Sequence, residues 1–134
     1  MGKINIVIGT HGRFGEELIK SVEMIIGSLE QVYCVSLLPS KSFEEFMNET
    51  DSVFAKLEGP TIALVDLFGG TPCNVFTVLT KKYNHQVIAG LNLPMLIDLY
   101  LKNDDEASEK IDELVENCIE VLKASAVHTN ERLQ

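Results

Sequence analysis

Three glycine-containing segments could carry chemistry, because each follows an apolar run and precedes a stretch with helical spacing. They are residues 9–15 (GTHGRFG), 66–74 (DLFGGTPCN) and 90–94 (GLNLP). If the apolar runs are strands of one parallel sheet, these segments meet at its carboxyl edge, where such sheets bind ligands. Backbone N–H groups and positive helix ends favour an anion there. The sequence therefore predicts an anion-binding pocket.

His11 is the reactive candidate in this pocket. An imidazole with an ordinary pKa of about 6.5 is largely neutral near pH 7 and has one lone pair that can attack phosphorus. If Asp66 lies on the neighbouring strand, its carboxylate would fix the ring tautomer and stabilise positive charge. Plainer interpretations remain: a hydrogen-bonding loop histidine, a turn or cap aspartate, and a tight turn at Gly69–Gly70. His85 and His128 are expected to be surface residues.

Common nucleotide motifs are absent from the sequence. The glycines at 9, 12 and 15 are spaced GxxGxxG, and His11 stands where a dinucleotide fingerprint needs its second glycine. The second apolar run ends in Val-Ser-Leu at 35–37, without the acidic residue that the fingerprint requires. No GxxxxGK[ST] segment occurs, which excludes a P-loop. A receiver-type aspartyl phosphate site is also disfavoured, because no acidic residues follow the first apolar run.

Apolar runs predict four strands, and segments of helical periodicity predict five helices. We expect the strands at 4–8, 32–38, 61–67 and 86–89. We expect the helices at 14–29, 42–57, 71–83 and 92–101, with a last helix that starts at Asp104 or Asp105 and runs to 122. A weak pattern indicates a further short strand at 124–128.

The ends of three helices carry recognisable capping residues. Ser42, with Glu45 three residues later, predicts a capping box. Thr71 is expected to be an N-cap that places Pro72 at the first helical position. Asn92 is expected to cap the short helix that follows the fourth strand.

The alternation of strands and helices predicts an α/β fold with parallel strands and right-handed crossovers. Because the strands are almost continuously apolar, helices should cover both faces of the sheet. We expect a doubly wound, mainly parallel four-stranded sheet in the order 2-1-3-4. Residues 1–134 should form a single domain with its core at about 3–122 and a tail at 123–134.

Composition narrows the class of function. The 134 residues are 46% apolar and 23% charged, which is ordinary for a globular domain. The formal charge of −9 argues against binding to nucleic acids or anionic membranes. The three cysteines, at 34, 73 and 118, fit neither a disulfide framework nor a CxxC motif. With no apolar run of membrane-spanning length and no leader pattern, we expect a cytoplasmic protein.

Three blocks of the sequence resemble the enzyme IIA domain of the mannose-class bacterial sugar phosphotransferase system. They are IVIGTHG at 6–12, LVDLFGGTPCN at 64–74 and VIAGLNLPML at 87–96. Their order and spacing also match that family, and together they are far more specific than any one of them. Arg13 and Phe68 stand where some mannose-type members carry tryptophans, so the sugar subtype stays open.

The resemblance implies a phosphoryl carrier without a metal or cofactor. His11 would accept a phosphoryl group on Nε2 from phospho-HPr and pass it to a histidine of the cognate IIB domain. Asp66 would bond the Nδ1 side of the ring, and Thr71 would donate its hydroxyl to a phosphate oxygen. The remaining positions implied in the pocket or its partner-facing rim are Gly12, Gly69, Gly70, Thr10, Arg13, Phe68 and Asn92. The family is usually homodimeric with an exchanged C-terminal strand, and it meets the membrane only through the transporter complex.

Two other functions remain open from the sequence. One is the phosphotransfer subunit of a dihydroxyacetone kinase, which has a similar histidine domain. The other is a non-catalytic flavodoxin-like regulatory or ligand-binding module, which would bind a small anion without becoming phosphorylated. The GTHG and LNLPML segments favour the sugar system over the former, and His11 with Asp66 argues against the latter.

Overall fold

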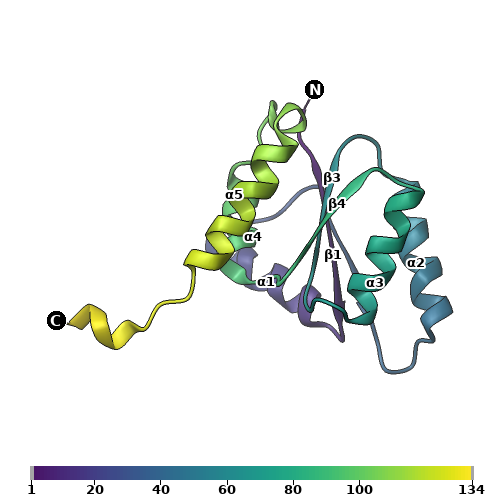
Figure 1. Ribbon diagram of the computed structural model, residues 1–134, viewed down its shortest axis with the longest axis horizontal. Coiled ribbons are helices and arrows are strands. Elements are labelled where there is room, and N and C mark those ends of the chain that lie inside the picture. Colours follow the sequence, from purple (N-terminus) through teal and green to yellow (C-terminus); the bar gives the residue numbers. More distant parts are fainter. Residues whose placement is uncertain (1, 134) are drawn as a thin grey trace.

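The computed structural model describes residues 2–133 and contains a four-stranded parallel sheet (Figure 1). The strands are β1 (Asn5–His11), β2 (Val32–Leu37), β3 (Thr61–Val65) and β4 (His85–Ala89). They pair in the order β2-β1-β3-β4, which confirms the predicted topology. The register places Gly9 beside Val65, so the end of β1 and the end of β3 lie next to each other.

Five α-helices cover the two faces of the sheet (Figure 1). One face packs against α1 (Phe14–Ile26), α4 (Leu93–Leu101) and α5 (Ile111–Ala124). The other packs against α2 (Phe43–Ala55) and α3 (Thr71–Val78). Short 3₁₀ turns follow α3, precede α5 and occupy Thr129–Leu133. No helix within residues 2–133 is both long enough and apolar enough to cross a membrane.

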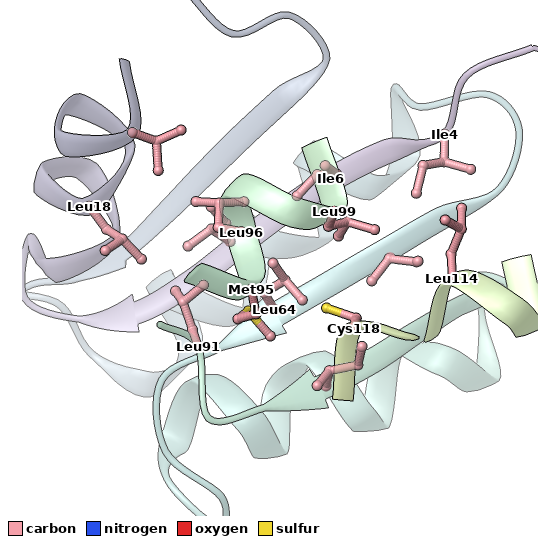
Figure 2. Close-up of a cluster of buried hydrophobic side chains, with 14 of the residues drawn as sticks. Ile4, Ile6, Leu18, Leu64, Leu91, Met95, Leu96, Leu99, Leu114 and Cys118 are labelled. Carbon is pink, nitrogen blue, oxygen red and sulfur yellow. The ribbon is translucent and has the colours of Figure 1, made fainter. Parts of the chain in front are cut away.

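Each inner strand supplies side chains to both hydrophobic cores, as its alternating pattern requires. On β1, Ile6 and Ile8 belong to the core under α1, α4 and α5, whereas Val7 belongs to the core on the opposite side. Figure 2 shows Ile6 in the first of these cores. Ile62 and Leu64 of β3 extend the first core. Because both faces are buried, β1 and β3 are rigidly held, and so are the residues at their carboxyl ends.

Local signals predicted some helix ends and missed others. The capping box of Ser42 and Glu45 is present at the start of α2, and Asn92 caps α4 as predicted. The N-cap of α3, however, is Gly70, so Thr71 is the first helical residue. The last helix begins at Ile111 rather than at 104 or 105, because a 3₁₀ turn at Ala107–Glu109 intervenes.

The expected strand at 124–128 is not formed in the single chain. Ala124 is the last residue of α5, and the segment after it is drawn leading away from the sheet (Figure 1). A strand needs a neighbour to satisfy its backbone N–H and C=O groups. The single chain offers this segment no neighbouring strand, so exchange between two chains stays a prediction.

Candidate active site

His11 ends β1 at the carboxyl edge of the sheet, and 47% of its side chain is exposed. Its position is fixed by the sheet on one side, where it lies opposite Leu37 in the register. The next amide, from Gly12, donates to the Leu37 carbonyl at 2.8 Å. Gly12 has a φ of +55°, so the chain turns away from the strand immediately after the histidine.

Asp66 holds the imidazole of His11 in one orientation. A single carboxylate oxygen, Oδ2, accepts the backbone N–H of His11 at 3.0 Å and lies 3.0 Å from Nδ1. Because an ionised carboxylate only accepts, Nδ1 carries the ring proton. The Nε2 lone pair is then free for attack on an electrophile. The predicted partnership of these two residues is therefore present in the structure.

The glycine turn after β3 lies against the reacting edge of the ring. A Cβ added to Gly70 would lie 2.7 Å from Cε1 and 3.3 Å from Nε2 of His11, so no larger residue fits without moving the ring. Gly69 has a φ of +84°, which favours glycine. The turn leads directly into α3, whose first-turn amides have no intrahelical acceptor. Free amides at a helix N-terminus are suited to an anion, and Thr71 is the first residue of this helix.

Thr10, the residue before His11 on β1, is completely buried. Its hydroxyl oxygen accepts the amide of Gly15 at 2.9 Å, which attaches the first turn of α1 to β1. A Cβ on Gly15 would lie within 3 Å of the Ile8 and Cys34 side chains, so the helix approaches the sheet closely here. Thr10 therefore positions the turn that follows His11, and its buried side chain is not among those that line the depression beside the ring.

Arg13 is 64% exposed and forms an ion pair with Glu16, with Nη1 3.1 Å from Oε1. Glu16 also accepts a hydrogen bond from Ser36 on β2. This bond, together with the charge of Arg13, holds the pKa of the Glu16 carboxyl below its usual range. The sequence did not predict the roles of Glu16 and Ser36, because the two residues lie 20 positions apart and belong to no motif.

Large apolar side chains are exposed on the segments that follow β1 and β3. Phe14, Leu67 and Phe68 are 48%, 59% and 86% exposed, respectively. A shallow depression beside the ring is lined by His11, Gly12, Leu37, Leu38, Pro39 and Lys41. The Lys41 ammonium donates to the Ser36 carbonyl at 2.7 Å and pairs with Glu49. Lys41 thus lines the depression beside His11, and no sequence signal identified it, whereas a place for Phe68 in the rim stays a prediction.

Asn92 has no hydrogen bond to His11 in the described part of the chain, so its place in the pocket stays a prediction. Its Oδ1 accepts the amide of Met95, and its Nδ2 donates to Ser125 Oγ at 2.8 Å. The turn before it is attached to β3, since the amides of Gly90 and Leu91 both donate to the Val65 carbonyl. Asn92 is therefore a structural member of the site's third segment.

The prediction of surface exposure is confirmed for one of the other two histidines and wrong for the second. His128 is exposed in the tail, as predicted, and lies 3.2 Å from Glu131. The prediction for His85 was wrong, because it is only 5% exposed. Its Nε2 lies 2.8 Å from the Phe76 carbonyl, and its ring stacks on Phe54 with centroids 4.1 Å apart. Burial lowers the pKa of this ring.

Comparisons with known proteins agree with this geometry. A family model described as "PTS system fructose IIA component" matches residues 5–119. The mannose-specific EIIAB component of Escherichia coli (strain K12) is 38% identical over 120 residues, or 87% of this chain. That match covers 36% of the Escherichia coli protein, so the chain spans about a third of the length of the curated mannose relatives it matches.

Two solved structures are similar over almost their whole length. The mannose/sorbose-specific IIA subunit from Enterococcus faecalis has a TM-score of 0.85 at 30% identity, with 93% of each chain covered. The EIIA component from Streptococcus agalactiae has a TM-score of 0.86 at 29% identity, with 96% of this chain and 98% of that chain covered.

Proposed function

Because the chain belongs to the mannose-class IIA family of the sugar phosphotransferase system, we propose that it is a phosphoryl carrier. In this role His11 accepts a phosphoryl group from phospho-HPr and passes it to a histidine of a cognate IIB domain, for sugar uptake. The strongest support is the pair of 3.0 Å contacts between His11 and one oxygen of Asp66. These contacts leave Nε2 as the nucleophile.

The covalent bonds that form and break in the transfer involve only the two imidazoles and the phosphoryl group. The Nε2 lone pair of His11 forms a bond to phosphorus while the bond from phosphorus to the donor ring nitrogen breaks. The bonding pair of electrons stays on the donor ring. His11 then carries the phosphoryl group on Nε2 and its proton on Nδ1, and the positive charge of this ring is stabilised by Asp66. Transfer to the IIB histidine repeats the step with His11 as leaving group.

The phosphoryl oxygens would be held by groups at the start of α3. First-turn amides of that helix lack an intrahelical acceptor, and Gly70 lies against Cε1 and Nε2 of His11. Thr71, as first residue of that helix, supplies a hydroxyl. Positioning and charge stabilisation of this kind account for most of the catalysis of phosphoryl transfer. Gly12 and Gly69 allow the two turns to approach the phosphoryl group.

The apolar rim would be the surface on which donor and acceptor proteins dock. Phe14, Leu67 and Phe68 are exposed on the segments that follow β1 and β3, and large exposed apolar residues around a site mark an interaction surface. Arg13 and Lys41 add cations that are already paired with glutamates. Such a rim permits repeated, weak association with different partners.

The test is phosphorylation of purified protein by phosphoenolpyruvate, enzyme I and HPr. We expect His11→Ala to abolish the incorporation of acid-labile phosphate. The control is Ser52→Ala, which changes an exposed position on α2 outside the site and outside the C-terminal segment and should incorporate phosphate like the wild type. Incorporation into the His11→Ala variant would contradict the proposal. A panel of IIB domains then identifies the acceptor and the class of sugar.

We further propose that the protein is cytoplasmic and works as a homodimer in which residues 124–128 pair with a second copy. The support is the family membership and the position of this segment, which extends beyond the end of α5 (Figure 1). Sedimentation velocity over a range of concentrations tests the dimer, and a monomer at every concentration would contradict it. Cell fractionation tests the location.

A further inference from the structure

The turn between β4 and α4 holds two distant parts of the molecule together. On one side, the amides of Gly90 and Leu91 donate to the Val65 carbonyl at 2.9 and 3.0 Å, directly before Asp66. On the other side, Gly90 packs against α5, since a Cβ at Gly90 would lie 3.1 Å from Leu122 Cδ2. The turn therefore lies between the strand end that carries the site carboxylate and the last turn of α5.

Asn92 uses both ends of its amide in this turn. The oxygen caps α4 by accepting the amide of Met95 at 3.1 Å. The nitrogen donates to Ser125 Oγ at 2.8 Å, and that hydroxyl donates to the Leu122 carbonyl at 2.7 Å. A helix cap needs only the acceptor oxygen. The bond to Ser125 is therefore additional to capping.

Ser125 is the point where the C-terminal segment leaves the body of the protein. Residues 126–133 extend away from the sheet (Figure 1), and their hydrogen bonds in the described structure lie within the tail. Val127 and Leu133 are 50% and 88% exposed. The Asn92–Ser125 bond is thus the last side-chain hydrogen bond between the body and the start of the tail in the described residues.

We propose that Asn92 is a positioning residue that fixes the exit of the C-terminal segment to the turn supporting the strand end of Asp66. An effect of this positioning on assembly rests on the dimer proposed above. A segment whose starting point is already fixed loses less conformational entropy when it pairs with a second copy. The Asn92–Ser125 bond therefore strengthens the dimer without contacting the partner chain.

Limited trypsin digestion tests the Asn92–Ser125 bond, because the chain has one cleavage site next to the bond and a second, reference site in the tail. Lys123 lies in the last turn of α5, and Arg132 lies in the tail. Asn92→Ser keeps a capping oxygen but is too short to reach Ser125, and Ser125→Ala removes the acceptor. We expect each variant to raise cleavage after Lys123, relative to cleavage after Arg132, by about 3- to 10-fold, as for loss of one hydrogen bond.

The double variant should show no more cleavage than the more affected single variant, because both changes remove the same bond. Ser125→Ala should also speed hydrogen exchange at the Gly90 and Leu91 amides, whereas a role of Asn92 confined to capping α4 predicts no change there. The control is Ser52→Ala, at an exposed position on α2. An unchanged cleavage ratio in both single variants would overturn the proposal.

Sedimentation equilibrium tests the effect of the Asn92–Ser125 bond on assembly separately from the existence of the dimer. If the wild type dimerises, Asn92→Ser and Ser125→Ala should weaken the dimer by about 3- to 10-fold, and Ser52→Ala should not. An unchanged dissociation constant alongside a raised cleavage ratio would overturn the link to assembly. If the wild type is monomeric throughout, the proposed dimer fails, while the cleavage ratio still decides whether the bond fixes the exit.

Discussion

At the scale of single residues, the site depends on one carboxylate oxygen that binds both the backbone and the ring of the same histidine. Asp66 Oδ2 accepts the main-chain N–H of His11 and lies at hydrogen-bond distance from Nδ1. Rotation of the ring would break the second contact while the first remained. The carboxylate thus fixes the rotamer and the tautomer together, and its charge is the component that a neutral amide cannot replace.

Asp66→Asn should slow phosphorylation of His11 and leave the fold intact. The amide has nearly the same shape, but it offers no charge to stabilise the phosphorylated ring. Because hydrogen bonds to charged groups are worth about 1 to 2 kcal/mol more than neutral ones, we expect a loss of about 10-fold or more in the transfer rate. Rapid-quench phosphorylation by phospho-HPr measures it, and a rate equal to that of the wild type would remove Asp66 from the mechanism.

Gly70→Ala should disturb the ring without unfolding the protein. Its φ of −75° suits alanine, so the backbone is not strained, but the new Cβ would lie 2.7 Å from His11 Cε1. We expect displaced imidazole signals in the NMR spectrum and a marked loss of transfer, with a nearly unchanged melting temperature. Normal transfer together with unshifted imidazole signals would show that the His11 ring accommodates the new Cβ without moving, which would contradict this prediction.

His85 should make stability fall as the pH is lowered. Burial lowers the pKa of its ring in the folded state, so between that value and about 6.5 the unfolded chain binds more protons. The contribution is fully present above the unfolded pKa and is lost as pH falls through the folded pKa. Urea unfolding from pH 7.5 to 5 should show the decline, and His85→Phe should flatten it. His128→Gln, the exposed control, should leave the decline unchanged.

At the scale of elements, local sequence patterns set the sheet order and most helices. The signals for α2 and α4 were complete because capping depends on residues three positions apart. The prediction failed for α5, whose acidic start at 104–105 is followed by a 3₁₀ turn before the helix begins. His85 was also misjudged, because its partners are Phe54 and the Phe76 carbonyl, 31 and 9 residues away.

Candidate residues in the three glycine segments were predictable, because each segment follows a strand of a parallel sheet. His11 and Asp66 meet as expected since β1 and β3 are neighbours. The supporting contacts were not predictable. Lys41 and Ser125 belong to no motif: Lys41 is bonded to the Ser36 carbonyl on β2, and Ser125 is joined to the third segment by its bond to Asn92.

Ser42→Ala should weaken α2 and with it the second hydrophobic core. The Ser42 hydroxyl accepts the Glu45 amide at 3.0 Å, and the Glu45 carboxylate accepts the Ser42 amide in return. Loss of such a cap costs about 1 kcal/mol of folding free energy. Urea denaturation should show this loss, whereas Ser52→Ala on the same helix should be close to neutral. Equal stabilities for the two variants would contradict the role of the capping box.

At the scale of the whole molecule, the formal charge of −9 acts on association rather than on the fold. Excess acidic residues would steer a donor with a basic face toward the site, which bears on encounter rates more than on affinity. We expect phosphoryl transfer from phospho-HPr to slow as the salt concentration rises, because the attraction between exposed charges is screened. Stopped-flow or rapid-quench measurements of the transfer rate test this. Rates that do not depend on salt would contradict steering, and the charge would then serve only solubility.

The single free nitrogen of His11 has a kinetic consequence. Since Nδ1 is occupied by Asp66, the proposed carrier would use Nε2 both as the nucleophile toward the donor and as the leaving group toward the acceptor. Both proteins would then need the same exposed edge of one ring. They would exclude one another, so the proposal predicts ping-pong kinetics, with each protein a competitive inhibitor of the other and no ternary complex on the pathway.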